Sequence, residues 1–92
     1  MITDAVTLHK RDNVATAIRD LSLHSDATIE FQGKSKTVRI VQAIPFGHKF
    51  ALQLIPKGKQ VIKYGEALGV ATKNIQPGEH VHTHNVISQR GR

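Results

Sequence analysis

The segment Ile44-Pro45-Phe46-Gly47 recurs in altered form as Ile55-Pro56-Lys57-Gly58 and as Ile75-Gln76-Pro77-Gly78. Each copy places an isoleucine before a turn that contains one proline and one glycine. Proline restricts φ to values that suit a turn, and glycine accepts the positive φ that many tight turns require. These turns use all 3 prolines of the chain. They predict a fold of short strands joined by tight connections.

Alternation of apolar and polar residues predicts strands through most of the chain after residue 26. Segments 28–31 and 37–41 flank the turn at Gln32-Gly33-Lys34, which is typical of a hairpin. Further short strands are expected at 50–54, 61–64, 68–72 and 80–84.

One helix is expected near the start of the chain. Asp12 can cap its N-terminus, because a carboxylate accepts hydrogen bonds from the free amides of the first turn. Apolar residues then follow at the spacing of one helical face, at Val14, Ala17, Ile18 and Leu21. The predicted fold class is therefore mainly β with one short helix.

A length of 92 residues predicts one small domain over residues 1–92, with a loose, flexible tail at 88–92. The absence of cysteine excludes disulfides, thiolate nucleophiles and cysteine metal sites. No apolar run has the length of a signal peptide or of a membrane span. The expectation is a soluble cytoplasmic protein.

The chain carries 13 Lys and Arg against 7 Asp and Glu, a formal charge of +6, which favours an anionic partner. The basic residues are spread along the chain, and surface solvation explains many of them. Only 3 Phe and 1 Tyr are available for stacking on bases. Neither a nucleic acid nor a membrane is therefore the expected partner.

Three histidines alternate in the block Gly78-Glu79-His80-Val81-His82-Thr83-His84-Asn85. On a strand they would share one face, with alternate Cα atoms about 6.6 Å apart. Two such imidazoles can converge on a metal ion, whereas all three would span about 13 Å on a straight strand. The alternative is that these histidines are merely exposed or hydrogen-bonded on a polar face.

Two other clusters are candidates for chemistry. Gly47 lets the backbone approach a ligand closely, while His48 can transfer protons and Lys49 can pair with a carboxylate. The alternative is an ordinary turn that ends in a solvated lysine. Lys63 and Tyr64 would point to opposite faces of a strand, so only one of them can join a given site, and a structural role is the favoured interpretation from the local pattern.

Taken in order, four blocks resemble the N-terminal domain of the altronate dehydratase family, which includes galactarate dehydratase and the small subunit of sulfolactate sulfo-lyase. The blocks are His9…Asp12-Asn13-Val14-Ala15, Gly47–Leu52, Val61–Gly65 and Gly78–Asn85, with Gly69 between the last two. The resemblance covers most of residues 8–86. It implies a β-clip fold of the SAF type.

The resemblance also implies a lyase that eliminates water from a sugar acid to give a 2-keto-3-deoxy acid. A divalent metal is implied as cofactor, with Fe²⁺ as the expected ion, held by His82 and His84. The catalytic candidates, which would contact the substrate carboxylate or assist proton transfer, are His48 and Lys49. The substrate-binding candidates are Asp12, Asn13, Lys63, Tyr64 and Asn85.

Altronate dehydratases carry several hundred further residues, so the expected partner is a separate large catalytic subunit, without which this small subunit is inactive. One alternative is the small subunit of a sulfolactate sulfo-lyase. Another is a non-catalytic SAF-type module that binds an acidic ligand or a carbohydrate. The sequence leaves a homo-oligomer open.

Overall fold

The computed structural model describes residues 3–88, which form nine strands and no helix. The strands are β1 (Ala5–Val6), β2 (Val14–Ala17), β3 (Asp26–Phe31), β4 (Lys34–Arg39), β5 (Lys49–Ala51), β6 (Gln60–Lys63), β7 (Glu66–Ala71), β8 (His80–Val81) and β9 (Val86–Ile87). Among the described residues no helix is long and apolar enough to cross a membrane. Residues 89–92 of the predicted tail lie outside the described residues.

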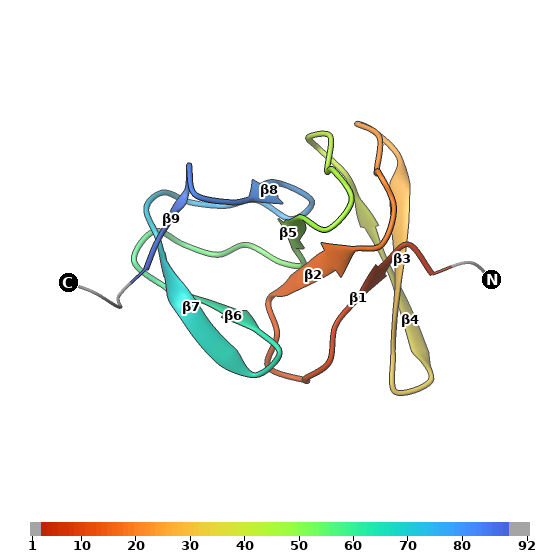
Figure 1. Cartoon of the computed structure of the whole chain (residues 1–92), viewed down its shortest axis with the longest axis horizontal. Coiled ribbons are helices and arrows are strands. Elements are labelled where there is room, and N and C mark those ends of the chain that lie inside the picture. Colours follow the sequence, from red (N-terminus) through yellow and green to blue (C-terminus); the bar gives the residue numbers. More distant parts are fainter. Residues whose placement is uncertain (1–2, 89–92) are drawn as a thin grey trace.

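The strands form two sheets that make a two-lobed molecule (Figure 1). The larger sheet has the order β4-β3-β1-β2-β5-β8, and the smaller one has the order β6-β7-β9. All neighbouring strands are antiparallel except β1 and β3, which are parallel. Strands β2 and β5 run between the two lobes (Figure 1).

Each lobe has its own hydrophobic core. The first core consists of Ala5, Ala15, Ala17, Leu21, Ala27, Ile29, Val38, Ile40, Ile44 and Phe50. The second core consists of Val14, Ala51, Ile55, Val61, Ala71, Ile75 and Val81. Because β2 and β5 contribute to both cores, both faces of these strands carry buried residues.

The prediction of a helix after Asp12 is wrong, because Val14–Ala17 is strand β2. Val14 packs in the second core while Ala15 and Ala17 pack in the first, so the strand lacks the alternation of a half-exposed strand. Apolar residues on both faces then imitate the spacing of a helical stripe. Ile18, the next member of that stripe, is exposed.

Four turns share one geometry, and three of them are the predicted proline–glycine turns. In each turn the fourth N–H donates to the first carbonyl, at 3.0–3.1 Å, in Ser22–Ser25, Pro45–His48, Pro56–Lys59 and Gln76–Glu79. The third residue has a positive φ in every case, at His24 (72°), Gly47 (84°), Gly58 (87°) and Gly78 (80°). The first of these turns contains neither proline nor glycine, so the sequence pattern did not reveal it.

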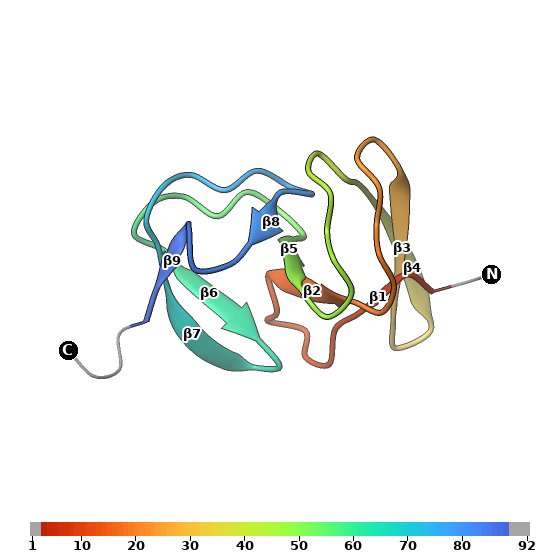
Figure 2. The same cartoon turned by 45° about the horizontal axis from the view of Figure 1, so that its top comes forward.

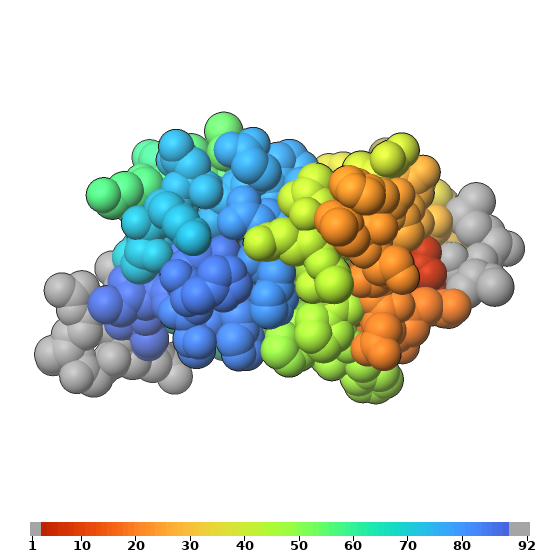
Figure 3. Space-filling model, turned by 90° about the horizontal axis from the view of Figure 1, so that it is seen from above, coloured from red at the N-terminus to blue at the C-terminus, as the bar shows by residue number. Residues whose placement is uncertain are grey.

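The four turns are joined in pairs by the residue that precedes each of them. Leu21 bridges Ile44, and Ile55 bridges Ile75, through reciprocal backbone hydrogen bonds of 2.8–2.9 Å. All four of these side chains are buried. With the top of the molecule tilted forward and then seen from above, the turn-bearing segments cover one face of the molecule (Figures 2 and 3).

Two hairpins complete the architecture, and the one predicted around Gly33 is confirmed as β3–β4. Both hairpins turn on two residues with positive φ, namely Gln32 (51°) with Gly33 (79°) and Tyr64 (54°) with Gly65 (80°). This pattern is that of a type I′ turn, whose twist matches the twist of paired strands. The second hairpin carries two of the candidate site residues, Lys63 and Tyr64.

Gly78 is predicted to be the least replaceable turn glycine. A Cβ atom there would collide with the backbone carbonyl of Arg39, whereas a Cβ at Gly58 would meet nothing within 4 Å. Both glycines have a positive φ, which costs a residue with a side chain about 1–2 kcal/mol. We expect Gly58→Ala to cost only that amount, and Gly78→Ala to destabilise the fold by at least about 4 kcal/mol.

Urea unfolding of the two variants, followed by circular dichroism, measures this difference. Gly58→Ala is the matched control, because it shares the turn geometry and the backbone strain. Equal losses in free energy of unfolding would show that strain alone, rather than the collision with Arg39, accounts for the cost at Gly78.

Candidate functional site

The predicted strand at 80–84 stops after Val81, and residues 82–85 form a turn around a buried asparagine. Asn85 is 0% exposed. Its side-chain oxygen accepts the N–H of His82 at 3.0 Å, and its side-chain nitrogen donates to the carbonyl of His80 at 2.8 Å. Asn85 was predicted to bind substrate, and the structure places it beneath the histidines, where it fixes their backbone.

The turn at Asn85 and the turn before β5 bring four histidines together. The ring of His48 stacks on those of His80 and His82, with centroids 5.0 and 4.6 Å apart. Those two rings are themselves 5.5 Å apart, and the tilted ring of His84 lies 5.3 Å from that of His80. The Nδ1 of His48 and the Nε2 of His80 are joined by a hydrogen bond of 2.8 Å.

Three of these residues form a donor set that fits a metal ion. One ring nitrogen from each of His48, His80 and His82 lies within 4.8 Å of the others. Burial lowers the pKa of His80, and the nearby imidazoles and Lys49 lower it further. The pKa of His82 is lowered in the same direction, by lost hydration, by His48, by Lys49 and by His84. Neutral imidazoles are the form that binds metals.

His84 lies outside this group of three, although its ring is next to that of His80. The pairing of His82 with His84 as metal ligands stays a prediction. The spacing of a straight strand limits one ion to two of the three alternate histidines, and the family resemblance selected His82 and His84 rather than His80. Its contact with His48 spans 32 residues of sequence, and no local pattern indicates such a contact.

In strand β5, Lys49 lies on the face opposite to that of its neighbour Phe50. It is aligned with Thr16 on β2 and with Val81 on β8, and Val81 belongs to the second core. The side chain of Lys49 is half-buried, and it has no hydrogen bond or ion pair among residues 3–88. Burial lowers the pKa of Lys49, and the positive charge of Lys63 lowers it further. An anion beside Lys49 would relieve both penalties.

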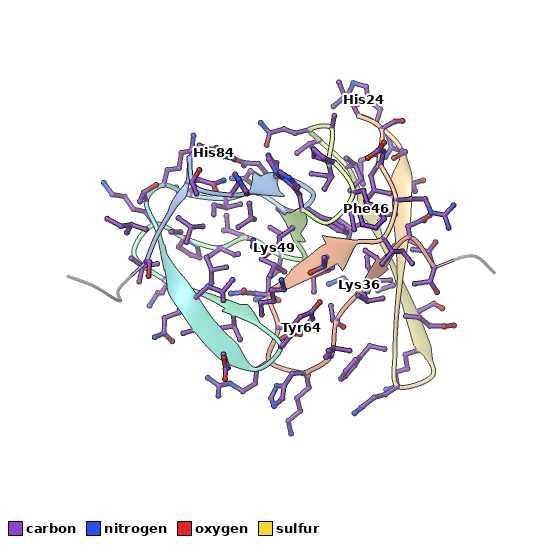
Figure 4. All side chains as sticks on the ribbon, in the orientation of Figure 1. His24, Lys36, Phe46, Lys49, Tyr64 and His84 are labelled. Atoms are coloured by element: carbon purple, nitrogen blue, oxygen red, sulfur yellow. The ribbon has the colours of Figure 1, made fainter. Side chains whose placement is uncertain are left out.

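A depression of about 230 Å³ connects Lys49 with the histidine cluster. Its polar lining includes Lys49, His82 and Thr83, and its apolar lining comes from Val61, Leu68 and Val86. His82 is therefore shared between the histidine cluster and the depression. The side-chain view places Lys49 in the middle of the molecule, between Tyr64 and His84 (Figure 4).

Lys63 and Tyr64 lie together on the same side as Lys49. The Lys63 ammonium is 4.8 Å from the centre of the Tyr64 ring, which is a cation–π distance. The Tyr64 hydroxyl is 3.4 Å from the Thr16 hydroxyl, and Thr16 is aligned with Lys49 across β2 and β5. The structure therefore brings three of the predicted site residues, Lys49, Lys63 and Tyr64, to one surface.

Asp12 and Asn13, which were also predicted to bind substrate, hold the two lobes together. Asp12 is buried, and its carboxylate accepts the N–H groups of Leu8 and His9 at 3.1 Å and that of Gly65 at 2.8 Å. The side chain of Asn13 donates to the Gln60 carbonyl and accepts the Ile62 N–H. Their polar atoms contact backbone groups, and the predicted contact with substrate stays untested.

Within residues 3–88, the absence of helix, the paired turns, and a histidine cluster beside an unpaired lysine together fit a β-clip domain of the SAF type. The chain belongs to the altronate/galactarate dehydratase SAF domain family, whose family model matches residues 3–89. The expected resemblance and the β-clip fold are thereby confirmed.

Three relatives illustrate the range of the family. The chain is 44% identical to altronate dehydratase of Escherichia coli over 80 residues, covering 87% of this chain and 15% of the relative. It is 38% identical to (2R)-sulfolactate sulfo-lyase subunit alpha of Chromohalobacter salexigens over 68 residues, covering 74% and 65%. It is 30% identical to galactarate dehydratase of Escherichia coli over 82 residues, covering 89% and 15%. The chain thus spans about 15% of the dehydratases that it matches.

Asp12 makes the stability of the fold dependent on pH. Burial by itself would raise the pKa of Asp12, but the backbone N–H groups of Gly65, Leu8 and His9 outweigh this effect and lower it. A lowered pKa in the folded state stabilises the fold above the unfolded value of about 3.9, and this stabilisation is lost as the pH falls through the folded value. We therefore expect the free energy of unfolding to decrease as the pH is lowered from about 3.9 through the folded-state pKa of Asp12.

The variant Asp12→Asn isolates this effect, because it keeps the size of the side chain but has one acceptor oxygen instead of two. We expect it to be less stable than the unmodified chain by about 1–3 kcal/mol at pH 7, with a smaller difference at pH 3. Urea unfolding at pH 7, 5 and 3 measures this. Asp26→Asn, at an exposed carboxylate paired with Arg39, is the control. A gap between Asp12→Asn and the unmodified chain that is unchanged at pH 3 would exclude the charge of Asp12 as the cause.

Proposed function

We propose that this chain is the SAF subunit of a cytoplasmic lyase that eliminates water from a sugar acid, together with a separate large catalytic subunit. The observation that carries the proposal is Lys49, a half-buried cation with no ion pair among residues 3–88, in a depression shared with His82. Membership of the dehydratase SAF family supports the reaction class. The match to a sulfo-lyase chain that is itself a subunit supports the division into subunits.

Such a dehydration removes the proton next to the carboxylate and expels the hydroxyl of the following carbon as water. The enol that remains tautomerises to a 2-keto-3-deoxy acid, so atoms balance without a redox partner. In the proposal Lys49 pairs with the substrate carboxylate, and Lys63 adds positive charge beside it. His84 is exposed, lies outside the group of three donors and has its ring next to that of His80, and in the proposal its imidazole accepts or returns the proton.

The donor set formed by His48, His80 and His82 fits a divalent first-row metal, since imidazole suits zinc, iron and neighbouring ions. The family resemblance favours Fe²⁺ among these ions. When bound, the ion would supply Lewis-acid stabilisation of the negative charge that develops on the substrate. His48 and His80 share a hydrogen bond, and the Asn85 turn holds the backbone of His80 and His82, so the donors are positioned in advance.

A second substrate, sulfolactate, is favoured by one specific observation. The chain is 38% identical over 68 residues to one sulfo-lyase subunit alpha and 47% identical over 47 residues to another. Sulfolactate is a dianion, and Lys49 and Lys63 together would suit it. Both substrates place a carboxylate at the same cations, so the two candidate functions share one site.

The metal site predicts a specific order of histidine variants. We expect His48→Ala, His80→Ala and His82→Ala each to weaken binding of Co²⁺, a spectroscopic substitute for Fe²⁺, by at least about 10-fold, since removing even an indirect supporter of a metal ligand has that effect. His84→Ala should weaken it much less. Titration followed by the visible absorption of Co²⁺ measures the affinities.

His24→Asn is the control, because it removes an exposed histidine on a turn away from the cluster, and asparagine tolerates the positive φ there. If His84→Ala abolishes binding and His48→Ala does not, the ligands are the originally predicted pair, His82 and His84. If none of the variants changes binding, the cluster holds no metal.

The lyase proposal is tested by co-expressing the chain with the large dehydratase-type subunit of the same genome. We expect the complex to convert altronate, galactarate or sulfolactate, and the chain alone to convert none of them. Lys49→Met should lower kcat/KM by about 10- to 150-fold, which is the effect of losing a hydrogen bond to a charged group.

Lys73→Met is the matched control, because it removes an exposed lysine that does not line the depression. Activity of the purified chain without a partner would overturn the separate-subunit arrangement. Binding of the acids to the chain, with no turnover in any complex, would favour the non-catalytic binding module instead.

A further inference from the structure

A second depression, of about 260 Å³, lies on the first lobe, and the proposed reaction makes no use of it. Its lining includes residues of the β3–β4 hairpin. This hairpin extends beyond the neighbouring strand β1 (Figure 1). Lys36, on this hairpin, is well separated from His84 in the side-chain view (Figure 4). We call this depression the hairpin groove and define it by six of its lining residues, which are Lys10, Ile29, Phe31, Lys34, Lys36 and Leu52.

The register of the hairpin explains the mixed lining of the groove. Phe31 is directly opposite Lys34, and Ile29 is directly opposite Lys36, so these four side chains share one face. Ile29 is buried in the first core, while Phe31 nearer the hairpin tip is only half-buried. The groove therefore continues the core surface outward as an apolar strip bordered by lysines. The Lys36 ammonium donates to the Leu52 carbonyl at 3.2 Å and ties the hairpin to the opposite wall.

The exposed charge of the groove is positive. The side chains of Lys10 and Lys34 are exposed and make no hydrogen bond or ion pair among the described residues. The acidic lining residue, Asp12, is buried and accepts three backbone N–H groups. Glu30 alternates to the other face of β3 and does not line the groove. The groove thus presents apolar surface and free positive charge.

A second copy of this chain is a poor occupant, since each copy carries a formal charge of +6. We propose that the hairpin groove binds an extended acidic segment of the large subunit, in which acidic residues flank an apolar side chain. The apolar side chain covers Phe31 and Leu52, and the acidic residues pair with Lys10 and Lys34. This inference rests on the proposed function for the identity of the partner.

The first test uses a probe peptide of alternating glutamate and leucine, titrated into the ¹⁵N-labelled chain and followed by NMR. The backbone signals of Phe31, Lys34 and Leu52 should shift. The double variant Lys10→Glu with Lys34→Glu should bind the peptide at least about 10-fold more weakly. The control Lys57→Glu with Lys59→Glu makes the same change in charge on a turn of the other lobe, and should change binding less than about threefold.

If both double variants weakened peptide binding equally, the hairpin groove would not be the binding site, because the result would show non-specific attraction to a basic chain. Tighter binding of a single-stranded oligonucleotide at the same signals would also overturn the proposal in favour of nucleic acid. Unchanged Co²⁺ binding at the histidine cluster verifies that the double variants are folded.

The second test is co-purification with the large subunit. Loss of co-purification in the groove variant but not in the control supports the inference, and equal recovery of both overturns it. If the peptide binds as expected while the unmodified chain never captures a large subunit, the proposed function fails and the acidic-peptide groove stands. The two failures are therefore distinguishable.

Discussion

The pairing of β2 with β5 is the constraint on which the rest of the fold depends. These strands lie between two cores, so both of their faces must pack. Small residues meet that demand, since Ala15 is aligned with Phe50 on the first core and Val14 with Ala51 on the second. The same alternation sends Lys49 to the face opposite Phe50. The cation of the candidate site is therefore positioned by the packing of the two lobes.

Local chemistry could be predicted from the sequence, and contacts between distant segments could not. The proline–glycine turns and the Gly33 hairpin follow from φ preferences that single residues impose. The turn at Ser22–Ser25 was not predicted, because His24 takes the place of glycine. The pairing of Leu21 with Ile44 holds His24 in its positive-φ conformation. The helix error has the same origin, because a strand between two cores has no exposed face to reveal its period.

The candidate site shows the same difference between local chemistry, which could be predicted, and contacts between distant segments, which could not. The motif blocks pointed to His48, Lys49 and His82, and the structure brings them to one region of the molecule. The same blocks contain Asn13 and Asn85, whose amides bond to backbone N–H and C=O groups of neighbouring segments. A polar residue in a motif can hold the backbone that presents a ligand rather than be the ligand. Sequence spacing does not distinguish the two roles, whereas burial does.

The site is rich in cationic side chains and poor in carboxylates. This charge balance couples the binding of its two proposed ligands, the divalent metal ion and the acid anion. After Phe31 the chain contains only two acidic residues, Glu66 and Glu79, and the side chain of Glu79 already accepts the Gln76 N–H. The lowered pKa values of His80, His82 and Lys49 show that positive charge here is already penalised. A divalent ion would add to that charge, and a bound acid anion would offset it. Each ligand therefore improves the electrostatic environment of the other, and metal and acid should bind this site more tightly together than apart.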